Sequence, residues 1–106
     1  MTAVTFYRSG GLLAGVSIAG HTGFAPEGED ILCAAISSAA YLTANTVTEV
    51  MQVPAEASVA EGENAEFRLL VPERDLIRCQ DVLKGLRLHL EGLCEQYPGQ
   101  IIITEV

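Results

Sequence analysis

Residues 2–19 read TAVTFYRSGGLLAGVSIA, and this stretch decides the fold of the 106-residue chain. Val4 and Phe6 fall on one face of its first half, because successive side chains of a strand point to opposite faces. The Ser-Gly-Gly at positions 9–11 is typical of a tight turn, and the apolar residues after it again favour a strand. The sequence therefore predicts a β-hairpin, which delivers the chain to His21.

Two longer patterns predict helices. In the first, apolar residues recur every three or four positions from Asp30 to about Met51, before Pro54. In the second, the same intervals follow Pro72 and continue to Tyr97, where a Pro-Gly pair ends the pattern. The apolar stripe of this second helix favours a core face, and dimerisation through it stays open as the alternative.

Three further segments complete the predicted sheet. Residues 57–60 and 65–71 flank the polar turn 61–64 as a second hairpin, and residues 101–103 favour a final, well-buried strand. The order ββαββαβ predicts an α+β domain in which a mainly antiparallel sheet packs with two helices. Because 106 residues are enough for one core and too few for two ordinary domains, we expect a single domain over residues 1–106.

The charge balance limits the partners of the chain. Fourteen acidic against six basic residues give a net charge of −8, which opposes contact with nucleic acid and favours a basic partner. Solubility alone is the simpler interpretation of the same charge. The apolar runs 12–19 and 31–38 are shorter than the roughly 20 residues of a membrane span. We therefore expect a cytoplasmic protein without membrane contact.

The cysteines indicate a reducing compartment. Cys33, Cys79 and Cys94 cannot all pair, and none belongs to a Cys-x-x-Cys motif, so neither a disulfide framework nor a zinc ribbon is predicted. Cys79 and Cys94 are interpreted as core or interface thiols. His89 and Cys94 are five residues apart, which does not place both on one helix face, so we expect no metal site. The sequence has no phosphate-binding glycine motif, and no cofactor is expected.

His21 and Cys33 flank a short loop that leads into the first predicted helix. With Asp30 as the N-cap, Cys33 becomes the third helical residue, where backbone N–H groups lack partners within the helix. The positive helix end and a nearby imidazolium both favour the thiolate. Cys33 then supplies a nucleophile, His21 a general base, and the N–H groups at the helix start an oxyanion hole. The plain alternatives are an inert buried thiol and a surface histidine.

The loop between these two residues has the composition of a cover over a peptide site. Gly23 and Gly28 punctuate it, and Phe24 is an apolar residue in an otherwise acidic segment. An ordinary connection has the same residue types. Asp30 is a candidate to orient the imidazole, although its predicted N-cap role competes for the carboxylate.

A specific resemblance is carried by Gly20-His21, an eleven-residue spacer, and the motif Asp30-x-x-Cys33-Ala34-x-x-x-Ser37. Over essentially its whole length, the chain resembles the ribosomal-processing cysteine protease family, Prp, of Firmicutes and related bacteria. The resemblance implies a catalytic dyad of His21 and Cys33, with Asp30 and Ser37 as supporting positions and the loop as a cover over the substrate. The implied substrate-loop residues are Gly20, Thr22, Gly23, Phe24 and Gly28.

Two of these positions carry qualifications of their own. Thr22 departs from the smaller residue that follows the histidine in the family, which bears on how the loop opens. A hydroxyl at the helix position of Ser37 also bonds readily to the carbonyl of Cys33, one turn earlier, and this is the plain interpretation of that residue.

The resemblance also implies a substrate. Members of the family remove a short N-terminal extension, which ends in an aromatic, hydrophobic motif, from large-subunit ribosomal protein twenty-seven, and they are typically homodimers. A cytoplasmic processing endopeptidase is therefore expected. Two other functions stay open: a non-catalytic ribosome-associated assembly protein that binds a basic ribosomal segment, and a redox-responsive thiol protein.

Overall fold

The computed structural model describes residues 1–20, 28–62 and 64–106, and within residues 28–30 the backbone alone. Strands and helices follow the predicted order ββαββαβ. The elements are β1 (Thr2–Ser9), β2 (Leu12–Ala19), α1 (Gly28–Asn45), β3 (Glu56–Ala60), β4 (Glu66–Leu70), α2 (Leu76–Gln96) and β5 (Ile101–Glu105). Two short turns, π-helical Thr46–Val50 and 3-10 Glu73–Asp75, extend α1 and precede α2.

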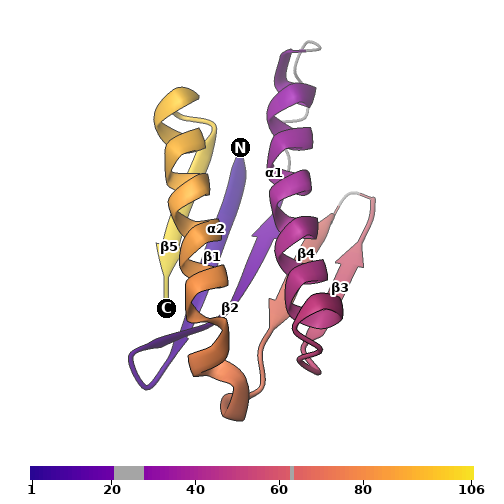
Figure 1. Ribbon diagram of the computed structural model, residues 1–106. Coiled ribbons are helices and arrows are strands. Elements are labelled where there is room, and N and C mark those ends of the chain that lie inside the picture. The colour runs from indigo at the N-terminus through magenta and orange to yellow at the C-terminus, as the bar shows by residue number, and fades with distance from the viewer. Residues whose placement is uncertain (21–27, 63) are drawn as a thin grey trace.

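The strands form one sheet in the order β3-β4-β2-β1-β5, and α1 and α2 lie antiparallel to each other on one face of it (Figure 1). Neighbouring strands are antiparallel, except that β1 and β5 are parallel. The predicted α+β architecture, with a mainly antiparallel sheet and two helices, is therefore confirmed.

The first hairpin turns at Gly10 and Gly11. Ser9 pairs with Leu12, which leaves the two glycines as a two-residue turn. Their φ angles are 56° and 83°, in a region that glycine enters without steric cost. This hairpin places β2 in the centre of the sheet, between β1 and β4.

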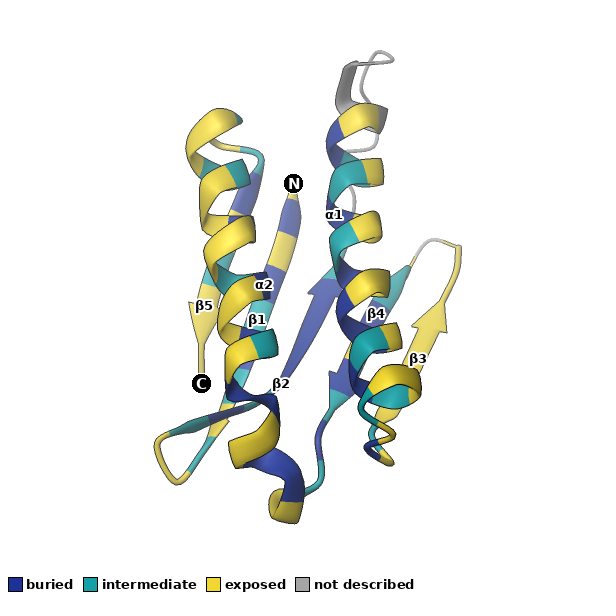
Figure 2. Ribbon diagram, viewed as in Figure 1, coloured by how far each residue is buried: buried dark blue, intermediate teal, exposed yellow. Residues whose placement is uncertain are grey.

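The core lies between the helices and the sheet face that they cover (Figure 2). Phe67 and Leu69 of β4 are buried there, as the two-residue period of that strand predicts. α2 presents the apolar stripe expected from its spacing. The buried apolar residues of that stripe are Leu76, Cys79, Leu83, Leu86 and Leu90.

The predicted start of the first helix is wrong. α1 begins at Gly28, so Asp30 is its third residue rather than its N-cap. The helical stretch ends at Val50, close to the predicted end at Met51.

The last strand is less buried than its sequence predicts. Ile101 is buried, whereas Ile102 is 48% exposed. β5 lies at the edge of the sheet and has a paired neighbour on one side. The expectation of a well-buried strand is therefore wrong for most of β5.

One helix meets the length and hydropathy criteria of a membrane span, which the short apolar runs of the sequence do not suggest. Residues Ile31–Val50 are long and apolar enough to cross a bilayer, with a mean hydropathy of 1.3. A core helix of a globular domain meets the same test, and the inner face of this one packs into the core through Leu32, Ile36 and Ala40.

A buried amide joins α2 to the central strand. Gln80 Oε1 accepts a hydrogen bond from the Leu13 N–H at 2.9 Å, and its Nε2 donates to the carbonyls of Leu13 at 2.7 Å and Leu76 at 2.8 Å. Leu13 precedes the part of β2 that pairs with β4, so the Gln80 side chain takes the place of a strand partner.

Replacement of this amide is expected to destabilise the fold. In Gln80→Leu the N–H and carbonyl of Leu13 stay buried without the amide, so the free energy of unfolding should fall by about 2–4 kcal/mol. Urea unfolding followed by circular dichroism measures the change. Gln96→Leu, at an exposed position of the same helix, is the matched control and should change stability by less than about 0.5 kcal/mol. Equal effects of the two substitutions would contradict the role given to Gln80.

Candidate active site

A cavity of about 270 Å³ opens between the middle of α1 and the hairpin of β3 and β4. The C-terminal end of β2 forms another part of the wall, through Ile18 and through Gly20, which directly follows the strand. The lining residues are Thr2, Ile18, Gly20, Cys33, Ile36, Ser37, Ala40, Tyr41, Val59, Ala60, Glu61, Gly62, Ala65, Glu66 and Phe67. The cavity therefore joins segments that lie far apart in the sequence.

Cys33 and Ser37 reach this cavity from one face of α1. They are four residues apart, which places them one above the other on a helix. The thiol is half-buried and the serine is exposed. The structure thus brings the predicted nucleophile and one predicted supporting residue to the same wall.

The helix start changes one part of the predicted chemistry. Cys33 lies five residues after Gly28, beyond the first turn. The N–H groups without partners inside a helix belong to its first turn, which starts at Gly28. The expectation that Cys33 is the third helical residue, among the N–H groups without partners, is therefore wrong.

The remaining predicted site residues divide into three groups. Gly20 lines the cavity with a φ angle of 80°, and a Cβ atom there would lie 2.9 Å from the Met1 carbonyl. Gly28 and Asp30 belong to the first turn of α1, with only their backbone described. Four predicted residues lie outside the described parts of the chain: His21, Thr22, Gly23 and Phe24.

Two aromatic residues form an apolar wall that sequence patterns did not single out as part of a site. The rings of Tyr41 and Phe67 meet edge to face, with centroids 6.2 Å apart and planes at 82°. The two-residue period places Phe67 on the inner face of β4, but Tyr41 gives no such signal. Their contact depends on how α1 crosses the sheet, which no local pattern specifies.

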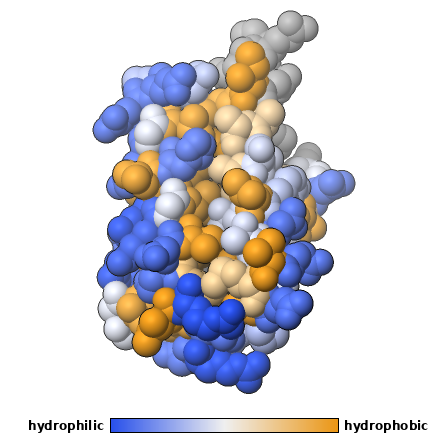
Figure 3. Space-filling view, viewed as in Figure 1, coloured by the Kyte–Doolittle hydropathy of each residue, from blue (hydrophilic) through white to orange (hydrophobic). Residues whose placement is uncertain are grey.

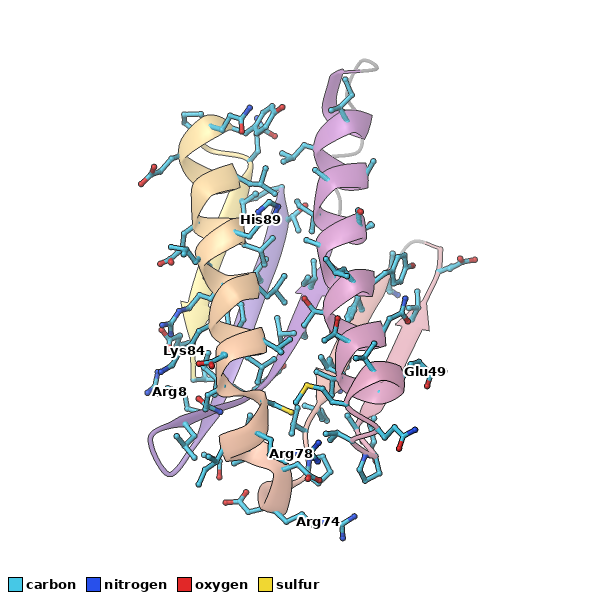
Figure 4. All side chains as sticks on the ribbon, in the orientation of Figure 1. Arg8, Glu49, Arg74, Arg78, Lys84 and His89 are labelled. Carbon is cyan, nitrogen blue, oxygen red and sulfur yellow. The ribbon has the colours of Figure 1, made fainter. Side chains whose placement is uncertain are left out.

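The charged lining of the cavity is acidic. Glu61 and Glu66 line it, and among the described residues no Lys or Arg does. Glu66 approaches Arg68 to 4.0 Å, and both side chains are more than 40% exposed, so solvent screens this pair. Four other cations lie in the half of the molecule away from the start of α1 (Figure 4): Arg8, Arg74, Arg78 and Lys84.

Part of the positive charge is held at the edge of the sheet by Glu105. Arg8 Nη1 donates to its Oε1 at 2.5 Å, and Arg87 Nη1 donates to its Oε2 at 3.2 Å. The hydrogen bond from Arg8 is the main cause that lowers the pKa of Glu105. These cations are consequently engaged away from the cavity.

A larger groove, of about 650 Å³, lies between α1 and α2. Figure 3 shows apolar side chains gathered along this line between the two helices. His89 reaches the groove from α2, on the side that faces α1 (Figure 4). None of the cysteines lines it, so the smaller cavity is the candidate active site.

The other two cysteines occupy different surroundings. Cys79 is fully buried in the core, and burial raises the pKa of its thiol, with the nearby Asp75 carboxylate adding to the effect. Cys94 is half-buried and donates its S–H to the Ile101 carbonyl at 3.4 Å. Both placements agree with the interpretation of these residues as structural thiols.

Metal binding finds no support in the described residues. Within residues 1–20, 28–62 and 64–106, no three His, Cys, Asp or Glu side chains come together closely enough to hold a metal ion.

The thiol of Cys33 is half-buried in the wall of a cavity, where a ligand in that cavity can reach it. Residues 1–102 match the family described as cysteine protease Prp, so the chain belongs to that family of cysteine proteases. No curated protein matches the chain.

Solved structures share the fold over the whole chain. SMU.848 from Streptococcus mutans has a TM-score of 0.87 and 22% identity, and the alignment covers 100% of this chain and 94% of that one. The essential ribosomal processing protease Prp from S. aureus, in complex with a substrate peptide, has a TM-score of 0.79 and 18% identity, with 100% of both chains covered. The same S. aureus protease with a covalently linked product peptide has a TM-score of 0.78 and 18% identity, again over 100% of both chains.

The different surroundings of the thiols predict an order of alkylation. Iodoacetamide reacts with thiolates, so the buried Cys79, with its raised pKa, should be modified last and remain largely unmodified at pH 8. Mass spectrometry of proteolytic fragments after timed alkylation of the folded protein measures the three rates. In urea all three cysteines should react alike. Modification of Cys79 as fast as Cys33 in the folded protein would contradict the assignment.

Proposed function

We propose that the chain is a cytoplasmic endopeptidase that removes the N-terminal extension of large-subunit ribosomal protein twenty-seven. The carrying observation is the position of Cys33, half-buried in the wall of the 270 Å³ cavity, in a chain of the cysteine protease family Prp. The peptide complexes of the S. aureus protease, which has the same fold, support a peptide as the substrate.

In this proposal Cys33 is the nucleophile and His21 the general base. Gly20, which precedes His21 in the chain, lines the same cavity as Cys33, and this supports the pairing. The imidazole takes the thiol proton, and the thiolate attacks the scissile carbonyl. The C–N bond then breaks as the imidazolium gives its proton to the leaving amine, and a water molecule, deprotonated by His21, hydrolyses the thioester.

The supporting residues have more modest proposed roles. Ser37 lies one helical turn from Cys33 in the same wall and can donate its hydroxyl to a bound peptide. Asp30, in the first turn of α1, is proposed to orient the imidazole of His21, because its N-cap role has been corrected. Gly20, Thr22, Gly23, Phe24 and Gly28 are proposed as the substrate loop.

The negative charge of the cavity lining and of the whole chain supports a basic substrate. Glu61 and Glu66 give the cavity an acidic rim, and the net charge of the chain is −8. Ribosomal proteins are basic because they bind RNA phosphates, so both the local and the overall field attract such a substrate. The proposed enzyme thus contacts the protein substrate rather than nucleic acid.

We also propose a homodimer that buries the groove between α1 and α2. Leu42 is 69% exposed and lines this groove together with Ala39 and Val82. An exposed apolar strip of this kind is typical of a protein interface. A second copy of the chain would remove it from water.

Removal of the thiol is the first test of the catalytic proposal. Cys33→Ala should lower the cleavage rate at least about 10³-fold, because the nucleophile is lost while a small side chain is kept. Mass spectrometry of a peptide that spans the N-terminal extension measures the products, and circular dichroism checks the fold. His21→Ala should be similarly inactive, and Cys94→Ala, which leaves the cavity intact, should cleave normally.

Two results would replace this proposal with another. Stoichiometric binding of the peptide by the wild type without turnover would favour the assembly protein. An activity switched by reductant with no peptide cleavage would favour the redox-responsive thiol protein.

A charge in the groove tests the dimer. Leu42→Glu should convert the protein to a monomer, because a carboxylate buried in an apolar interface loses its hydration. Size-exclusion chromatography with light scattering measures the mass. Leu88→Glu is the matched control: Leu88 is 70% exposed but lies outside the groove lining, so this variant should stay dimeric. A monomeric wild type would contradict the proposal directly.

A further inference from the structure

One wall of the candidate active site is the edge of the sheet. β3 is the last strand of the order, and among the described residues no strand pairs with its outer side. Val59, Ala60 and Glu61, at the end of β3 and just after it, line the cavity that contains Cys33. The open strand edge and the cavity are therefore continuous.

The hydrogen bonds of β4 show which backbone groups of β3 face outward. The N–H of Val71 donates to Ala14 at 2.9 Å, and the N–H of Gly20 donates to Ala65 at 3.2 Å. Odd-numbered residues of β4 therefore bond to β2, and because bonding alternates along an antiparallel strand, even-numbered ones bond to β3.

The register then assigns the residues of β3. Glu66 and Arg68 pair with Ala60 and Ser58, so those two residues bond to β4. The intervening residue, Val59, directs its N–H and its carbonyl to the outer side, and Ala57 does the same one step earlier. Each of them presents one donor and one acceptor along the open edge.

The side chains on this edge alternate in the same way. Val59 lies opposite Phe67, a residue of the helix-facing side of the sheet, so its side chain lies on that side too. It is 50% exposed and lines the cavity near the aromatic pair of Tyr41 and Phe67. An added strand would follow the same period and direct every second side chain toward this cavity.

We infer that the substrate peptide binds as an extra strand on the outer edge of β3, antiparallel or parallel to it, with one large apolar side chain in the cavity beside Cys33. The inference rests on the proposed peptidase function and adds how that site holds its substrate. Main-chain hydrogen bonds to Val59 and Ala57 fix the peptide, and the cavity selects the side chain.

The cavity matches that occupant in size and charge. About 270 Å³ exceeds the roughly 150 Å³ of a cavity that holds benzene, so one aromatic or large aliphatic side chain fits. Glu61 and Glu66 flank the strand end and favour a Lys or Arg close to that apolar residue. β5, at the other edge of the sheet, lines no part of the cavity.

Proline at Val59 tests the strand contact on the enzyme. Val59→Pro removes the outward N–H but no bond to β4, and proline is tolerated on edge strands. Val59→Ala trims the side chain and keeps the N–H, so it measures the side-chain share of any effect. KM for the extension peptide should rise about five- to tenfold more in Val59→Pro than in Val59→Ala, with kcat changed less than about twofold. Equal KM values in the two variants, with normal circular dichroism, would overturn the inference.

Methylated peptides test the same contact on the unaltered enzyme. Each peptide carries one N-methyl group, which removes one main-chain donor. Methylation at every second residue of the paired segment should raise Kd, measured by fluorescence polarisation, and methylation at the residues between should raise it much less. Uniform effects along the peptide, or none, would overturn strand addition.

The readouts separate the two proposals. Cleavage of the extension peptide without a two-residue period would leave the peptidase in place and refute the added strand. Binding with the period but without cleavage would support the added strand and refute the peptidase. A peptide that neither binds nor is cleaved would overturn both.

Discussion

The central position of β2 is the constraint on which the rest of the structure depends. β2 pairs with β1 on one side and with β4 on the other, so the two hairpins of the chain meet along this strand. Gly15 allows the close approach: a Cβ atom there would lie 2.5 Å from the Leu69 carbonyl, well inside contact distance. No larger residue fits without displacing β4, and β4 carries β3 and the outer wall of the cavity with it.

The two ends of β2 have different contacts, one with α2 and the other with the cavity. At its start, Leu13 is held by the amide of Gln80, which fixes α2 against the sheet. At its end, Gly20 lines the cavity, while α1 brings Cys33 over the same end of the sheet. The cavity is thus built beside the end of β2 and under α1, so its position follows from the pairing of β2.

Much of this architecture is available from sequence because periodicity is a local property. The alternation through Val4 and Phe6 specifies β1, and the spacing of Leu83, Leu86 and Leu90 specifies α2 without any knowledge of the fold. The start of α1 is harder to predict, since Gly28-Glu29-Asp30 suits a first helical turn as well as a loop. The edge position of β5 depends on its parallel pairing with β1, which the apolar run at its start does not encode.

Some residues of the candidate site can be predicted from local sequence, whereas others come together only in the folded protein. Cys33 and Ser37 can be found from sequence because they share a motif and a helix face. Tyr41, Val59 and Phe67 come from three different elements, and they meet only after the sheet order has been set. Glu61 and Glu66 carry no sequence signal that distinguishes them from solvated charges, because their meaning depends on the cavity that they line, which forms only in the folded protein.

The thiols illustrate how the fold separates reactive from inert chemistry. Cys79 lies on the buried face of α2, where burial and the Asp75 carboxylate both disfavour its charged form. Its folded pKa exceeds its unfolded one, so its contribution to stability is present below the unfolded pKa and is lost as the pH rises through the folded value. Cys33 instead opens onto a cavity beside a strand edge.

An exposed edge invites unwanted pairing with other chains, and natural proteins usually protect it with Lys, Pro or a covering segment. β3 itself contains neither Lys nor Pro, and its one charged residue, Glu56, lies at the end remote from the cavity. Among the described residues, an edge left open beside the proposed nucleophile is advantageous when an extended peptide is the ligand, because the same backbone groups that create the hazard then hold the peptide.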